Sequence, residues 1–90
     1  MNTTDIQDLL ANLDKLHTTG LGTVRIKRNL HLDTNDITSW CKEKIQNSDT
    51  SIHKNGKNWY VKAADCTITI NASSYTIITA HTQLYELQNH

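Results

Sequence analysis

The first half of the chain spaces its apolar residues as a helix does. Ile6, Leu9, Leu10, Leu13 and Leu16 recur at intervals of three and four residues, which places them on one face of a helix. Shorter segments with similar spacing follow. The pattern predicts three helices, at about residues 4–17, 20–30 and 35–46.

Beyond residue 50 the apolar residues alternate with polar ones, as they do in strands. Asn55-Gly56 is a strong signal for a tight β-hairpin turn. Ile68 and Ile70 alternate with threonines, which predicts one apolar and one polar face. Ile77 and Ile78 are adjacent, which predicts a last strand that is apolar on both faces and central in its sheet. The predicted strands lie at about residues 51–54, 58–62, 66–71 and 75–81.

Helices followed by hairpin-connected strands indicate the α+β class: three N-terminal helices and then a four-stranded antiparallel meander. Ninety residues form a single domain, residues 1–90. No run approaches the ~20 apolar residues that span a bilayer. Two cysteines are too few for a disulfide framework. We therefore expect a cytoplasmic protein with reduced thiols and no membrane segment.

Polar residues and glycine predict where the helices begin and end. Gly20 suits a left-handed stop after the first helix, and Thr18 or Thr19 suits the cap of the second. Thr34 is the expected cap of the third helix. In the second helix, apolar residues lie on two sides, which predicts a helix that is held from both.

The formal net charge is zero, but the charges are segregated along the chain. Residues 21–30 hold Arg25, Lys27 and Arg28 and no acidic residue. Lysines also outnumber acidic residues over positions 42–62. This pattern predicts a local basic surface. The alternative is a mixed, solvated surface with no partner.

Several classes of site lack their sequence pattern. No histidine pair is spaced with a cysteine or an acidic residue as zinc ligands are. The three glycines are scattered and form no phosphate-binding loop. We therefore expect neither a metal nor a cofactor, and paired-carboxylate hydrolysis is disfavoured because the acidic residues are scattered.

A metal-free acid–base site is compatible with the remaining residues. His81 ends the last predicted strand, and a histidine can act as general acid or base. Arg25 and Arg28 share a helix face and can bind phosphate oxygens bidentately. His17 is the second candidate acid or base. The alternative for His81 is a structural hydrogen-bonding role.

The residues expected to bind a substrate surround these groups. Of Trp59 and Tyr60, one must face each side of the sheet, and the outward ring can stack on a base. We assign Tyr60 this role beside Lys57. The complete set of expected substrate-binding residues is Thr18, Thr19, Lys57, Tyr60, Asn71 and Thr79.

Several short motifs occur together in this chain: Leu16-His17-Thr18-Thr19, Gly22, Arg25-Ile26, Asn29-Leu30, Trp40-Cys41-Lys42, Ile70-Asn71 and Tyr75 to His81. Over roughly residues 9–82 they resemble a small bacterial family of unknown function. The resemblance names no activity.

The layout also resembles, more distantly, the barnase–colicin–RelE group of small ribonucleases. Residues 25–30, 36–45 and 75–79 occupy the places of that group's characteristic elements. The resemblance implies metal-independent RNA cleavage, with His81 and His17 as acid and base and Arg25 and Arg28 on the phosphate. The chain departs from the group in its neutral charge and in having no glutamate in the predicted sheet.

Three functions follow as hypotheses. The first is a metal-independent endoribonuclease, whose partners would be RNA and an antitoxin. The second is a non-catalytic binding protein, such as an inhibitor of a host defence nuclease carried by a phage or other mobile element (anti-CRISPR-like). The third is an interaction domain that dimerises through an edge strand.

Overall fold

The computed structural model describes residues 3–34, 36–47, 50–63 and 66–82. Its elements confirm the α+β class with three α-helices and an antiparallel four-stranded sheet, in the order β1-β2-β3-β4. In chain order these are α1 (Thr3–Ala11), the short 3-10 helix η1 (Leu13–Lys15), α2 (Gly20–Leu30), α3 (Ile37–Gln46), β1 (Ser51–Asn55), β2 (Asn58–Lys62), β3 (Cys66–Asn71) and β4 (Ile77–Thr82).

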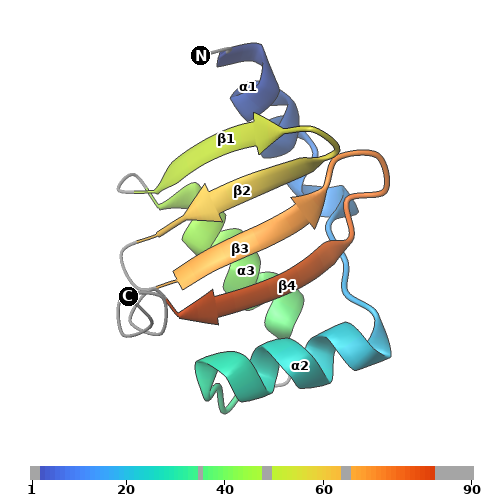
Figure 1. Ribbon diagram of the computed structural model, residues 1–90, viewed down its shortest axis with the longest axis vertical. Helices are drawn as coiled ribbons and strands as arrows, with labels where there is room; N and C mark the ends of the chain where they lie inside the picture. The colour runs from blue at the N-terminus through green and yellow to red at the C-terminus, as the bar shows by residue number, and fades with distance from the viewer. Residues whose placement is uncertain (1–2, 35, 48–49, 64–65, 83–90) are drawn as a thin grey trace.

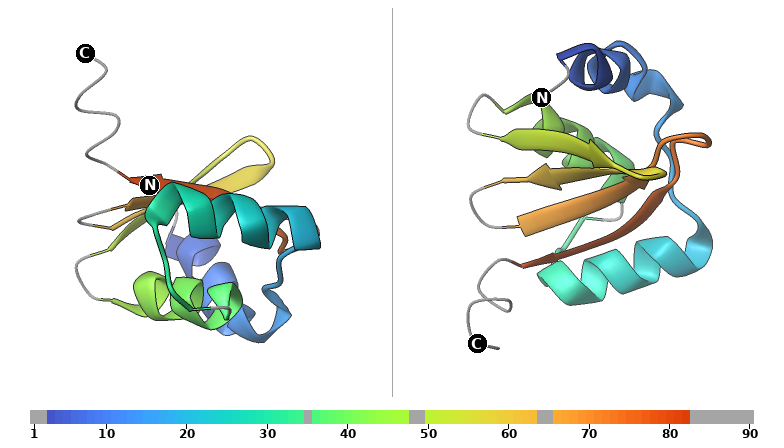
Figure 2. Two further views of the ribbon diagram at one scale, coloured as in Figure 1. Left: turned by 90° about the horizontal axis from the view of Figure 1, so that it is seen from below. Right: turned by 45° about the horizontal axis from the view of Figure 1, so that its top comes forward.

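The helices leave one face of the sheet uncovered by any described helix. Figure 1 looks onto this face, with α3 crossing behind the strands and α2 running beside β4. The turned views in Figure 2 place α1 and α3 on the same side of the sheet. We call the uncovered side the open face.

The first helix ends earlier than its apolar spacing predicts. α1 stops at Ala11, and the side-chain amide of Asn12 donates to the carbonyl oxygen of Asp8 at 2.7 Å. Such a local bond competes with continuation of the helix. The prediction that all helices precede all strands also needs correction. His17, which lies before α2 in the chain, forms a β-bridge with Thr76 at the edge of the sheet.

α2 has one anchored side rather than two. Thr19 caps the helix by accepting from the backbone N–H of Gly22 at 2.9 Å, so Gly20 starts this helix instead of ending the previous one. A Cβ on Gly22 would lie 3.0 Å from the Thr19 hydroxyl oxygen and 3.7 Å from the carbonyl oxygen of Ile77, so this side of α2 packs against β4. The opposite side of α2 is exposed to solvent.

The cap of α3 is Asp36 and not Thr34. The Asp36 carboxylate accepts from the backbone N–H of Ser39 at 3.1 Å and from its hydroxyl at 2.9 Å. These bonds hold the pKa of Asp36 below its ordinary value of 3.8. Thr34 instead accepts from the backbone N–H of Asp36 at 3.1 Å, which helps to place the capping residue.

The strands present the faces that alternation predicts. Gly56 adopts φ 64° in the first hairpin turn, a conformation that favours glycine. Trp59 is buried on the helix side and Tyr60 lies on the open face. Ile68 and Ile70 of β3 are fully buried, while Thr69 between them points the other way.

The prediction that the last strand is central was wrong. β4 is an edge strand, and its pairing with β3 shifts register because Ile78 is an extra residue between the pairs Ile70–Ile77 and Thr69–Thr79. This bulge lets Ile77 point into the core and leaves Ile78 38% exposed. The two adjacent isoleucines thus mark a bulge.

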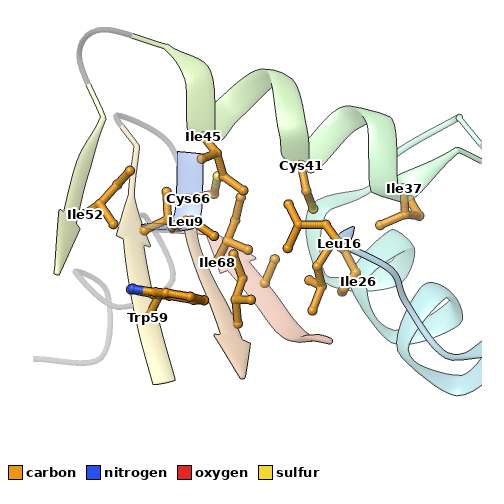
Figure 3. Packing of buried hydrophobic residues seen from close by; sticks show 14 residues of the cluster. Leu9, Leu16, Ile26, Ile37, Cys41, Ile45, Ile52, Trp59, Cys66 and Ile68 are labelled. Atoms are coloured by element: carbon orange, nitrogen blue, oxygen red, sulfur yellow. The ribbon is translucent and has the colours of Figure 1, made fainter. Parts of the chain in front are cut away.

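The core lies between the sheet and the helices. In Figure 3, side chains of α3 and of the strands point toward each other. Both thiols belong to this layer, where Cys41 and Cys66 are buried and form no disulfide. The full set of buried apolar residues is Leu9, Leu16, Ile26, Ile37, Cys41, Ile45, Ile52, Trp59, Val61, Cys66, Ile68, Ile70, Ile77 and Ala80.

Burial of Cys41 makes the stability of the protein sensitive to alkaline pH. Desolvation raises the pKa of this thiol from 9.0 to about 12, and proximity to Cys66 adds to the shift. Above about pH 9 the unfolded thiol ionises while the folded one stays protonated, so the free energy of unfolding falls by roughly 1.4 kcal/mol per pH unit for one such group. Urea titrations of the wild type from pH 7 to 11 should show this fall, and Cys41→Ala should show a shallower one. Equal slopes would contradict the assignment.

Candidate functional site

The open face carries a continuous row of polar side chains, one from each strand. The pairings His53–Tyr60, Tyr60–Thr69 and Thr69–Thr79 align four residues across the full width of the sheet. All four are partly exposed. We call this set the central row; it consists of His53, Tyr60, Thr69 and Thr79.

A second row runs parallel to the first, two residues further along the strands. Lys62 pairs with both Ser51 and Thr67, and Thr67 pairs with His81. Lys62 and Ser51 are exposed, whereas Thr67 is only 5% exposed. Lys62 and His81 are two strands apart, which separates their backbones by about 10 Å.

Two aromatic rings of the central row already stack on each other. The centroids of His53 and Tyr60 are 5.6 Å apart, with an angle of 24° between the ring planes. The side-chain amide of Asn58 donates to the Tyr60 hydroxyl at 3.4 Å. Contacts on two sides restrict the Tyr60 ring, so a flat ligand would find a partly ordered stacking surface.

The strands and the acidic side chains lie in different parts of the fold. Residues 51–63 and 66–82 contain lysines and histidines but no aspartate or glutamate. The acidic side chains that the structure describes lie in or beside helical segments: Asp8, Asp14, Asp33, Asp36 and Glu43. Although the net charge of the chain is zero, the described residues of the sheet therefore include no carboxylate that would repel an anion.

The two candidate acid–base histidines lie at opposite ends of β4. His17 is held before the strand begins, where its Nε2 is 3.1 Å from the Thr76 hydroxyl and its Nδ1 is 3.0 Å from the Lys15 carbonyl oxygen. His81 lies near the far end, roughly 17 Å away at about 3.3 Å per residue. The structure does not bring this pair together around one phosphate.

Arg25 and Arg28 lie on the exposed side of α2. Neither is in a row of the open face. The side of α2 that faces β4 carries Asn29, whose amide donates to the Ala80 carbonyl oxygen at 3.1 Å. The arginines are therefore close to each other, but their surface is distinct from the two rows.

The residues expected to bind a substrate have different roles in the structure. Tyr60 and Thr79 belong to the central row. Thr18 shares a 2.7 Å hydrogen bond with the Thr23 hydroxyl, and Thr19 caps α2. Lys57 is exposed near the first hairpin turn, where its carbonyl oxygen accepts from the backbone N–H of Ala72 at 2.8 Å.

Asn71 organises a turn. Its Oδ1 accepts from the backbone N–H groups of Ser73 and Ser74 at 2.9 and 3.0 Å, and from the Ser74 hydroxyl at 3.2 Å. These bonds support the connection between β3 and β4, which also contains Tyr75 at φ 60°. The oxygen of this amide is thus engaged in holding the loop.

The site residues expected from the sequence do not include His53, Lys62 or Thr69, although alternation places Thr69 on the polar face of its strand. The two turn residues of this hairpin are Gly56 and Lys57, and the resulting pairing of Asn55 with Asn58 places His53 opposite Tyr60. A turn centred on Asn55-Gly56 would instead place residue 53 opposite residue 58, so this pairing does not follow from the sequence signal. The position of Thr79 opposite Thr69 depends on the bulge in β4 and likewise does not follow from the sequence.

No group of three or more histidine, cysteine, aspartate or glutamate side chains within the described ranges could hold a metal ion. Among the helices in those same ranges, none is long and apolar enough to cross a bilayer.

Comparison with known proteins identifies a family but no activity. No curated protein and no solved structure matches the chain. Residues 10–81, most of the chain, match the family described as protein of unknown function DUF3781. This match agrees with the expected resemblance to an uncharacterised small family, while the resemblance to ribonucleases stays a prediction. The protein is therefore a member of the DUF3781 family.

Proposed function

We propose that this protein binds single-stranded RNA across the open face of its sheet. The observation that carries the proposal is the stacked His53–Tyr60 pair, set in a polar row that spans four strands. Binding of single strands commonly combines aromatic stacking with positive charge along the backbone. The open face has both, with Lys62 exposed in the neighbouring row.

The polar groups of the row favour RNA over an apolar ligand. Thr69 and Thr79 present hydroxyl groups beside the stacked rings, and hydroxyls both donate and accept hydrogen bonds. The ribose 2′-hydroxyl is likewise donor and acceptor, and its recognition is what distinguishes RNA from DNA at a protein site. A deoxyribose oligonucleotide is expected to bind more weakly for this reason.

Cleavage of the bound RNA is a separate prediction. The wide separation of His17 and His81 removes the arrangement in which both act on one phosphate. His81 alone, on the open face, is the residue on which cleavage would depend. Incubation of the same oligonucleotide with wild type and His81→Asn, in EDTA, tests this; cleavage by wild type that is lost in the variant would support it.

The charge of Lys62 gives the first test of the binding proposal. Lys62→Ser is expected to lower the affinity for a fluorescein-labelled decauridylate and to reduce the slope of log affinity against log salt concentration by about 1. Fluorescence anisotropy between about 50 and 200 mM salt measures both quantities.

Lys54→Ser is the matched control, because Lys54 is also an exposed lysine of the sheet. Lys54 lies two residues after the buried Ile52 in β1, so its side chain is on the same face, the helix side of the sheet. We expect the Lys54 variant to keep the wild-type slope. Equal losses in both variants would argue against the open face as the binding surface, and no binding by wild type would refute the proposal.

A further inference from the structure

The outer side of α2 exposes aliphatic side chains that the fold does not bury. Leu21 is 77% exposed and Val24 is 54% exposed, one helical turn apart. Arg25 and Arg28 are exposed on the same side of the helix. We call these four residues the α2 ridge: Leu21, Val24, Arg25 and Arg28.

The ridge is not needed to hold α2 in place. Ile26 is fully buried on the inner side, and Asn29 bonds to the backbone of β4. Gly22 is also buried on this inner side, next to the carbonyl oxygen of Ile77. Because the inner side already holds α2 in place, Leu21 on the outer side, at 77% exposure, adds little to the stability of the fold. Apolar side chains that stay in water in this way are typical of an interaction surface.

The basic residues around the ridge favour a negatively charged partner. Residues 16–32 include Arg25, Lys27 and Arg28 and contain no aspartate or glutamate. The first turn of α2 has no acidic residue, so the positive end of the helix dipole adds to the same field. A ligand that carries carboxylates would therefore be attracted to this helix.

Another exposed apolar side chain lies on β4, the strand against which α2 packs. Ile78, the bulged residue of β4, is 38% exposed and directly follows Ile77, the residue whose carbonyl oxygen Gly22 approaches. Leu21 precedes Gly22 in the chain.

We propose that the α2 ridge docks an acidic amphipathic helix of a protein partner. Such a helix would place leucine-type residues against Leu21 and Val24 and glutamates against Arg25 and Arg28, at the spacing that helix-in-groove contacts use. RNA fits less well, because its bases stack on flat rings and would gain little from aliphatic branches. A symmetric second copy would bring no carboxylate to the arginines, because residues 16–32 contain no aspartate or glutamate.

A model peptide can test this surface without knowledge of the natural partner. The probe is a labelled helix of about 18 residues with leucines on one face and glutamates beside them. Its counterpart has glutamine in place of every glutamate. By fluorescence anisotropy we expect the glutamate peptide to bind the full chain about tenfold more tightly than the glutamine peptide. Leu21→Ser should weaken binding of the glutamate peptide by about tenfold.

Leu10→Ser provides the control, since Leu10 is 41% exposed but lies on α1. Binding unchanged in that variant and weakened in Leu21→Ser and Val24→Ser would support the proposal. Equal binding of both peptides, no effect of the ridge variants, or no binding at millimolar peptide would overturn it. Displacement of the peptide by decauridylate would overturn the proposal and indicate that the ridge binds RNA. Displacement by self-association that depends on Leu21 would overturn it and indicate a second copy of the chain.

Discussion

Ile26→Ala is expected to remove a large part of the stability of the protein. Ile26 is fully buried and packs α2 against the core. Truncation of a buried isoleucine costs about 2–5 kcal/mol, because the removed methyl groups leave a cavity. Domains are stable by only ~5–15 kcal/mol, so the urea midpoint should fall sharply. Unfolding can be followed by tryptophan fluorescence, with Trp59 in the core as a reporter.

Val24→Ala is the matched control for this prediction. Val24 lies in the same helix but is 54% exposed, and alanine has a higher helix propensity than valine. Its free energy of unfolding should stay within about 0.5 kcal/mol of wild type. If the two variants were equally stable, the anchored side of α2 would have been assigned incorrectly.

Tyr60→Leu is expected to weaken binding of single-stranded RNA more than any other single change on the open face. Leucine retains apolar volume but has no ring on which a base can stack. Loss of one stacking contact costs about 1–3 kcal/mol, or roughly fivefold to a hundredfold in the dissociation constant. The stack with His53 would be lost as well, so the ordered surface disappears with the ring.

Tyr60→Phe separates the ring from its hydroxyl. Phenylalanine keeps the stacking surface and loses only the 3.4 Å contact with Asn58. Its affinity for decauridylate should stay close to that of wild type, measured by the same anisotropy titration. A loss as large as that of Tyr60→Leu would assign the effect to the hydroxyl and contradict the stacking account.

The fold was largely predictable because local patterns agree with it. The Asn55-Gly56 signal locates the first hairpin, and the alternation in β3 determines which side chains reach the core. The end of α1 was harder to predict. The apolar spacing continues through Leu13 and Leu16, whereas the Asn12 side chain interrupts the helix. The edge position of β4 was not predicted, because two adjacent isoleucines can indicate either a strand buried on both faces or a bulge, and the structure has a bulge.

The candidate site was only partly predictable, because it depends on register and on which helix face is buried. Alternation predicted that Trp59 and Tyr60 face opposite sides of the sheet, but not which of the two is buried; the structure buries Trp59 and leaves Tyr60 on the open face. The separation of His17 from His81 could not be inferred, because it follows from the pairing of His17 with Thr76. The exposure of the α2 arginines follows from the anchoring of Gly22 and Ile26, a tertiary contact.

An NMR titration tests the proposed RNA-binding face most directly. Decauridylate would be added to ¹⁵N-labelled protein at low salt, and amide shifts would be mapped onto the structure. The account predicts the largest shifts in the central row, at His53, Tyr60, Thr69 and Thr79, with small shifts in α3. Shifts concentrated on the helices, or no shifts at saturating oligonucleotide, would contradict it.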